Sequence, residues 1–307
     1  MNVKTLIYSE NTELSLQLLG KAIQLSGAGV SAVAVTPDQA DTLVGSGAAK
    51  VYLVKDRSLD ALRAGILDVV ARESPDLVMV GSTKRGRELA PRVAAALNAG
   101  YSGDCFDAQQ GEGGFAVKRL AYGGSSIAST IIRGKPAVIS VSPRSFQKPE
   151  AQGKQGEIIE LNTSTPAPGV KVLETRPKKT SDAGLESAKI IVSAGRGFKK
   201  REDLKLLEEL ASELGAKMGC SRPVSADLGW MDQWVGISGK KVAPRLYVAC
   251  GISGTIQHAA GIRDSQIIVG VNSDEAAGIH ELSDYSIVGD IYTVLPALTR
   301  ALRERAK

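Results

Sequence analysis

Apolar residues in the first hundred positions follow two different spacings. Short apolar runs rich in β-branched residues are typical of buried strands, at 3–8, 30–35, 51–54 and 76–81. Between these runs, apolar residues recur every three or four positions and predict helices over 12–26, from Pro37, and over about 58–73 and 85–97. Strands that alternate with helices of this length favour a parallel sheet with right-handed crossovers.

The pattern changes after residue 100. Three β-rich segments, separated by Gly and Pro, lie at 115–124, 127–133 and 136–143. We expect them to extend the same sheet with antiparallel strands. Residues 162–187 combine three prolines with clustered Ser and Thr, and they predict a linker, with a short strand possible at 170–175.

The alternation restarts after this linker. It predicts helices over 201–214, from about 253, and over 291–304, and strands at 188–195, 216–220, 245–251, 266–272 and 285–290. The predicted fold class is therefore α/β, in two domains. A mostly parallel α/β domain covers 1–187, and a doubly wound, Rossmann-like domain covers 188–307.

Composition narrows the function classes. The chain has 33 glycines but only 4% aromatic residues, which suits tight strand-to-helix turns and not the stacking of bases on aromatic platforms. The net charge of +5 is compatible with a solvated face, and equally with attraction to a phosphate-bearing cofactor or an acidic partner. Because no DNA- or RNA-binding motif accompanies the charge, we expect no nucleic acid partner.

The cysteines and the apolar runs bear on location. Cys105, Cys220 and Cys250 are far apart, so we expect no disulfide framework, no structural zinc and a reducing compartment, the cytoplasm. With only two histidines, a His-rich metal site is excluded. No apolar run approaches the roughly 20 residues of a membrane span, and the N-terminal segment does not have the pattern of a signal or transit peptide.

Polar residues follow several predicted strands of the second half. In open α/β sheets, ligands bind at these carboxyl ends, where backbone N–H groups favour phosphate. Two of these residues have two interpretations each. Arg196 is placed to meet a pyrophosphate or a carboxylate, or it is a solvated arginine in a turn. Asp290 accepts hydrogen bonds from a ribose, or it is the N-cap of the last helix. Thr255 replaces the last glycine of a nucleophile elbow, which argues against acyl transfer. In the first half, the strand-to-helix turn at 81–92 is the one such edge with charged residues, Lys84 and Arg85.

Read in order, these segments resemble the alpha subunit of electron transfer flavoprotein. The matching segments are SAGRGF (193–198), SRPVSADLGW (221–230), the run VGISGKKVAPRLYVACGISGTIQHAAG with its continuation to Asp274 (235–274), and DYSIVGDIYTVLPALTRAL (284–302). A weaker, collinear resemblance covers 81–97 and 134–146 in the first half. The combination KVAPRLYVACGISGTIQHAAG (241–261) is highly specific, whereas GISG alone is not.

The resemblance implies an electron carrier and not an enzyme with its own substrate, so no catalytic residue and no metal is expected. It implies one FAD, and a heterodimer with a beta subunit that holds AMP or a second FAD. Electrons would come from acyl-CoA or other dehydrogenases, as in fatty acid β-oxidation. They would pass, through flavin semiquinone and hydroquinone states, to a quinone oxidoreductase or another acceptor.

The resemblance also implies the residues that contact FAD. Arg196 and Ser221 are expected at the phosphates or the ribityl chain, and Arg222 over the isoalloxazine ring. Two loops are expected beside the ring and the ribityl chain, the first at Val235, Gly236, Ile237 and Ser238, and the second at Ser253, Gly254, Thr255, Ile256, Gln257 and His258. Within them, Ser238 is expected near N5, His258 near O2 and Gln257 near the ribityl chain. The adenosine end is expected at Asn272, Asp290 and Ile291.

One loop departs from the family pattern, which usually reads V-G-Q-T-G-K. Here Ile237 and Ser238 stand in place of the amide and the threonine, so the flavin potential is expected to differ. We read His280 as structural or solvated. Three alternatives stay open: an electron-bifurcating flavoprotein that uses NADH, a stand-alone flavin-dependent oxidoreductase, and a nucleotide-binding regulatory module. The second would need a base near N5, and no such His or Glu is evident.

Overall fold

The computed structural model describes residues 3–26, 29–150, 153, 156–162, 174 and 184–305. The chain divides into two compact units. The first comprises 1–122 and 126–173, and the second comprises 174–307 with 123–125. Most of the predicted linker 162–187 lies outside the described residues, and so does the strand expected at 170–175, apart from residue 174.

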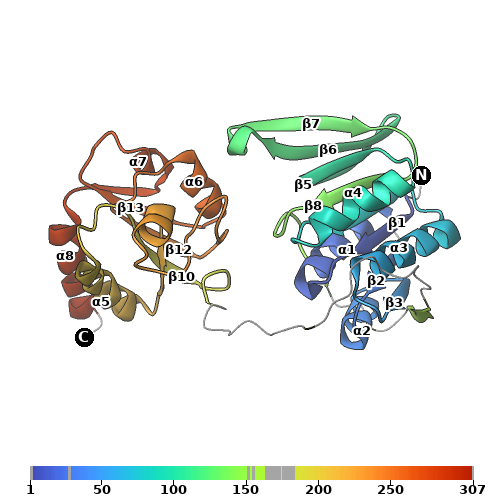
Figure 1. Ribbon diagram of the computed structural model, residues 1–307, viewed down its shortest axis with the longest axis horizontal. Coiled ribbons are helices and arrows are strands. Elements are labelled where there is room, and N and C mark those ends of the chain that lie inside the picture. Colours follow the sequence, from blue (N-terminus) through green and yellow to red (C-terminus); the bar gives the residue numbers. More distant parts are fainter. Residues whose placement is uncertain are drawn as a thin grey trace. The chain divides into compact units, whose positions relative to one another are not determined.

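The first unit is built on a nine-stranded sheet (Figure 1). Its strand order is β7-β6-β5-β8-β4-β1-β2-β3-β9. The strands are β1 (Thr5–Tyr8), β2 (Val30–Ala34), β3 (Lys50–Val54), β4 (Leu77–Gly81), β5 (Tyr101–Gly111), β6 (Gly114–Ala121), β7 (Ser126–Ile132), β8 (Ala137–Val141) and β9 (Glu157–Leu161). Neighbouring strands are parallel except at β6, which pairs antiparallel with β5 and β7.

Helices cover both faces of this sheet. They are α1 (Thr12–Ser26), α2 (Pro37–Gly45), α3 (Leu59–Glu73) and α4 (Gly86–Ala96). The apolar stripes of α1 and α2 pack in one core, and those of α3 and α4 pack in the other. The starts of two helices follow from local chemistry, because the Thr36 and Ser58 hydroxyls accept the backbone N–H groups of Gln39 and Ala61.

The β-rich segments do extend the same sheet, with one difference from the expectation. The strands β6 and β7 form an antiparallel hairpin, whereas β8 runs parallel to β4. Strands β5 and β9 were not expected from the sequence. The strand β5 has no regular apolar alternation, since it carries glycines and polar residues and its register shifts twice. The strand β9 is a five-residue strand at the edge of the sheet.

The second unit holds a five-stranded, all-parallel sheet in the order β11-β10-β12-β13-β14. The strands are β10 (Ile190–Ala194), β11 (Lys217–Cys220), β12 (Leu246–Cys250), β13 (Ile268–Asn272) and β14 (Tyr285–Val288). The helices are α5 (Leu204–Leu214), α6 (Ile256–Ile262), α7 (Ile279–Leu282) and α8 (Ile291–Arg305). Helices α5 and α8 pack on one face, and α6 and α7 on the other, so the unit is doubly wound.

Both units confirm the predicted α/β fold class. Element boundaries agree within a few residues: α6 begins at Ile256, slightly later than expected, and the four-residue helix α7 was not expected. Gly215, in the left-handed conformation at φ 58°, ends α5 where the sequence placed its end. In the described part of the chain, no helix is long and apolar enough to span a bilayer.

Candidate functional site

The strand order of the second unit defines where a ligand can bind. Numbered along the chain, the order is 2-1-3-4-5, which is the flavodoxin-like doubly wound arrangement. The chain turns in opposite directions after β10 and after β12, so their connections diverge and leave a crevice at the carboxyl ends of these two strands. Gly195 and Arg196 follow the first of these strands, and Gly251 and Ser253 follow the second.

Glycines allow the two loops at this crevice to approach each other closely. A Cβ at Gly195 would lie 2.0 Å from the Gly251 carbonyl oxygen, and a Cβ at Gly197 would lie 2.8 Å from the Gly251 Cα. The loops are also joined, because the Gly195 N–H donates to the Cys250 carbonyl at 2.8 Å and the Gly197 N–H to the Gly251 carbonyl at 3.1 Å. Any side chain at these positions would separate the loops.

Two arginines stand at this edge. Arg196 and Arg222 are exposed, and neither forms an ion pair with another described residue. Ser221, beside Arg222, is buried and its N–H donates to the Ala194 carbonyl, which ties the end of β11 to the end of β10. The two guanidinium groups thus flank the first strand of the unit, where they can meet an anionic group.

The loop at residues 235–240 is fastened to the same edge. The Val235 N–H donates to the Cys220 carbonyl, and the Ile237 N–H donates to the Gln257 carbonyl, both at 2.8 Å. The loop therefore joins the end of β11 to helix α6. The Ser238 hydroxyl lies 3.4 Å from the Trp234 indole nitrogen, from which it accepts. Because this oxygen accepts that bond, its own proton stays free to donate.

His258 is buried beneath this loop, with 5% of its surface exposed. Its Nε2 lies 3.0 Å from the Tyr247 hydroxyl, while Nδ1 has no hydrogen-bond partner in the described part of the chain. The Val235 backbone lies beside the ring but outside hydrogen-bonding geometry. Burial lowers the pKa of His258 to about 4, so the ring is neutral at physiological pH.

The remaining predicted residues lie at the ends of the other strands. The Asn272 amide donates to the Ile252 carbonyl at 2.9 Å and accepts from the Asp274 N–H. The Asp290 Oδ1 accepts the Tyr292 N–H at 3.0 Å, so this residue caps α8. Ile291, the first residue of α8, is buried in the core. Ser253, Thr255, Ile256 and Gln257 are exposed, and Gly254 and Asn272 are half-buried.

The residues at this edge fit FAD. Two unpaired guanidinium groups suit a diphosphate, exposed hydroxyl and amide groups suit sugar hydroxyls, and glycine loops leave room for a cofactor to approach the backbone. Gly254, at φ 77°, lets its loop pack against α7, since a Cβ there would lie 2.2 Å from the Ile279 nitrogen. The unpaired Nδ1 of His258 is a polar atom that still needs a partner.

The thiols at this edge have no evident chemical role. Burial raises the pKa values of Cys220 and Cys250 to about 12, so both stay protonated and poor nucleophiles. Among the described residues, no group of three or more His, Cys, Asp or Glu side chains is placed to hold a metal ion.

The corresponding edge of the first unit is filled by the chain itself. There the strand order reverses between β1 and β4. A Cβ at Gly81 would lie 2.5 Å from Leu14 and 2.7 Å from the Ser9 hydroxyl. The buried Gln39 side chain donates to the Ser9 carbonyl at 2.8 Å and closes the space further. The second unit is therefore the better place for a cofactor.

The doubly wound second unit, with glycine loops and exposed arginines at its crevice, is typical of proteins that bind a nucleotide cofactor, and comparison with known proteins specifies the family. Residues 184–263 match the "Electron transfer flavoprotein FAD-binding domain", and residues 5–166 match the "Electron transfer flavoprotein domain". The chain belongs to the electron transfer flavoprotein family and is similar to its alpha subunits.

Similar proteins extend over almost the whole chain. Protein FixB of Salmonella typhimurium is 34% identical, over 96% of this chain and 97% of its own length. Protein FixB of Clostridium saccharobutylicum is 36% identical, over 96% and 93%. The electron transfer flavoprotein subunit alpha of Megasphaera elsdenii is 37% identical, over 95% and 93%. The resemblance inferred from the sequence is thereby confirmed.

Two aromatic residues at this site were not foreseen. Tyr247 fixes the His258 ring, and Trp234 fixes the Ser238 hydroxyl. Tyr247 reads as an ordinary core position of a buried strand, so only the alternation of β12 hinted that it faces the α6 side of the sheet. Trp234 lies in an irregular segment that carries no periodic pattern.

Proposed function

We propose that this chain is the FAD-binding alpha subunit of a heterodimeric electron transfer flavoprotein. The observation that carries the proposal is that the family match and the candidate binding crevice lie in the same part of the chain. The residues that match the FAD-binding domain include the crevice between β10 and β12, where the exposed arginines and the glycine loops meet. FAD supplies the redox chemistry when bound, since it accepts and passes on electrons singly or in pairs.

The protein's own residues would then bind and tune the cofactor. Arg196 and Ser221 hold the phosphates or the ribityl chain, and Arg222 places positive charge against the isoalloxazine ring. Ser238 would donate its free proton to N5, and the Nδ1–H of His258 would donate to O2. Because burial keeps His258 neutral, it acts as a hydrogen-bond donor and not as a second positive charge.

The other predicted contacts complete this arrangement. The ring and ribityl loops are Val235 to Ser238 and Ser253 to His258, and the adenosine end is at Asn272, Asp290 and Ile291. These last three lie beyond residue 263, where the matched FAD-binding domain ends. In this proposal Asp290 serves α8 as a cap through Oδ1, which leaves its second oxygen for a ribose hydroxyl.

The partners belong to the same proposal. The relative from Megasphaera elsdenii is named as a subunit alpha, and this chain would likewise pair with a beta subunit that holds AMP or a second FAD. The domain at 188–307 binds FAD, and the domain at 1–187 docks to the beta subunit. Acyl-CoA or other dehydrogenases donate electrons, and a quinone oxidoreductase or another acceptor receives them, in the cytoplasm.

The test is co-expression with the beta subunit and measurement of FAD content in the purified complex. We expect a yellow complex, whereas a colourless, folded complex in excess FAD would contradict the proposal. Arg196→Ala should weaken FAD binding by about tenfold or more, because a charge-assisted hydrogen bond contributes about 1.5–3 kcal/mol. Arg245→Ala is the matched control, since this exposed arginine precedes β12 at the opposite edge of the same sheet.

A second measurement addresses the ring. Arg222→Ala should make the first electron harder to add in a reductive titration, because positive charge near the ring favours the reduced flavin. An unchanged titration would show that Arg222 does not lie close to the isoalloxazine ring. Reduction of the complex by NADH alone would point to the bifurcating alternative.

A further inference from the structure

A polar cavity of about 480 Å³ lies in the first unit, where the antiparallel extension begins. Residues of α4, β6 and β7 contribute to its lining, together with the neighbouring strands β5 and β8. Its volume falls in the range of small-molecule sites, about 300–1,000 Å³. All of its lining residues belong to the first unit, and none of them is assigned to the flavin.

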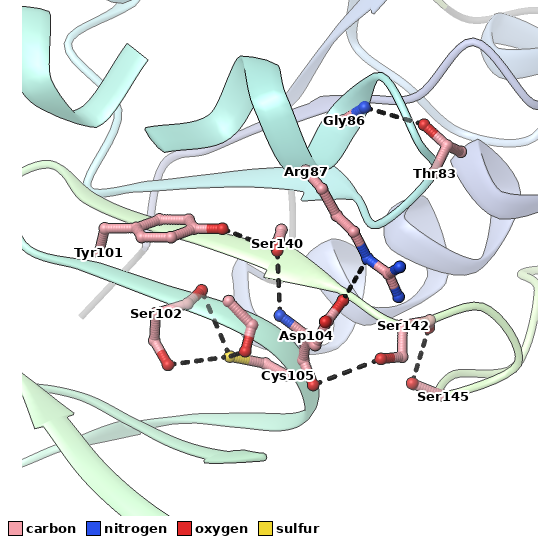
Figure 2. A network of polar contacts seen from close by, with 11 residues as sticks. Thr83, Gly86, Arg87, Tyr101, Ser102, Asp104, Cys105, Ser140, Ser142 and Ser145 are labelled. Carbon is pink, nitrogen blue, oxygen red and sulfur yellow. Dashed lines mark hydrogen bonds and ion pairs between the residues drawn. The ribbon is translucent and has the colours of Figure 1, made fainter. Parts of the chain in front are cut away.

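The β5 side of the cavity is shaped by a break in the strand. The pairing of β5 with β8 shifts register between Ser102 and Cys105, and Asp104 adopts a left-handed backbone at φ 53°. Such bulges turn a side chain out of the pleat and recur beside binding sites. The Asp104 carboxylate accepts the Arg87 Nε–H at 3.0 Å (Figure 2). The bulge therefore presents a fixed carboxylate to the cavity.

A chain of hydroxyl groups holds this arrangement in place. The fully buried Ser140 hydroxyl accepts the Asp104 N–H at 3.0 Å and lies 3.1 Å from the Tyr101 hydroxyl. Figure 2 shows these groups side by side on β5 and β8. Burial raises the pKa of Tyr101, so the phenol keeps its proton. Thr130, from β7, adds an exposed hydroxyl to the lining.

Arg119 supplies a positive charge without a counter-ion. It lines the cavity from β6, and no hydrogen bond or ion pair joins it to another described residue. Its side chain lines the cavity together with Tyr101, Ser102 and Asp104 of β5. Arg87, in contrast, is already paired with Asp104. The lining arginines and aspartate thus leave one unbalanced positive charge.

We propose that this cavity binds a small hydroxylated carboxylate. The planar fork of Arg119 matches a carboxylate group in two parallel hydrogen bonds. Asp104, Thr130 and Tyr101 then bond the hydroxyl groups of the same molecule. The Asp104 carboxylate repels a second negative charge, so a monoanion with hydroxyl groups is preferred to inorganic phosphate.

The test uses the complete chain in complex with its beta subunit and loaded with FAD, titrated calorimetrically with three probes. Sodium gluconate carries one carboxylate and five hydroxyl groups, sorbitol is a neutral analogue, and inorganic phosphate is the competing anion. We expect saturable gluconate binding, at least tenfold weaker sorbitol binding, and phosphate binding weaker than that of gluconate. No saturable gluconate binding, or equal binding of sorbitol, would overturn the proposal.

Substitutions of the lining residues distinguish binding at this cavity from nonspecific attraction to a positive charge. Arg119→Ala should abolish gluconate binding, and Arg119→Lys should weaken it at least tenfold, because lysine keeps the charge but lacks the fork. Asp104→Asn should strengthen phosphate binding, and asparagine tolerates the left-handed backbone. Arg63→Ala, at an exposed arginine of α3 outside the cavity lining, is the control. Unchanged FAD content and an unchanged melting temperature show that a variant is folded. If the folded Arg119→Ala variant still binds gluconate fully, the proposed site is refuted.

Discussion

His258 should make the second unit sensitive to mild acid. The folded state holds its pKa at about 4, whereas an unfolded histidine titrates near 6.5. As the pH falls through this window, the unfolded chain takes up the proton first, so the free energy of unfolding decreases. Between pH 7.5 and 4.5 this linkage removes about 2–3 kcal/mol of stability, and above pH 6.5 the contribution is fully present.

Tryptophan fluorescence can follow this unit alone. The chain has two tryptophans, Trp230 and Trp234, and both pack against the core of the second unit. We would measure urea unfolding of the full chain, without added flavin, from pH 7.5 to 4.5. His258→Gln is the comparison, because the amide can still bond the Tyr247 hydroxyl but does not titrate. The loss of stability between pH 7.5 and 4.5 should be smaller by about 2–3 kcal/mol in this variant. Equal pH dependence in the two proteins would refute the reasoning.

Two further substitutions test the edge of the second sheet. Gly251→Ala should destabilise the unit by about 2–4 kcal/mol, because φ 64° is strained for alanine and its Cβ would lie 2.8 Å from the Gly197 Cα. Calorimetry should show a melting transition lower by about 10 °C. Gly45→Ala, which meets no atom within 4 Å, should change stability by less than about 1 kcal/mol. Asp290→Ala should cost about 1 kcal/mol in urea unfolding through loss of the α8 cap, while Asp290→Asn should restore it. Equal stability of the two Asp290 variants would show that the cap contributes nothing.

The fold was largely readable from local patterns. Helix α1 begins and ends at the predicted residues 12 and 26, because the periodicity of its leucines is a property of that segment alone. Strands β1 to β4, β8 and β10 to β14 were predicted for a similar reason, because a run of apolar residues marks each of them in the sequence. β5 and β9 were not found, since their pairing partners stabilise them and their own residues show little β pattern.

For the site, the sequence determined which residues could meet a cofactor, and the family resemblance named it. A glycine or an arginine after a strand is visible in one dimension, because strand ends can be predicted. Strand order, which places the crevice between β10 and β12, emerged only in three dimensions. So did the contact of Gly195 with Gly251, the pairing of His258 with Tyr247 and the cavity below Arg119. These contacts join residues of different elements, and their energies depend on packing that no local pattern records.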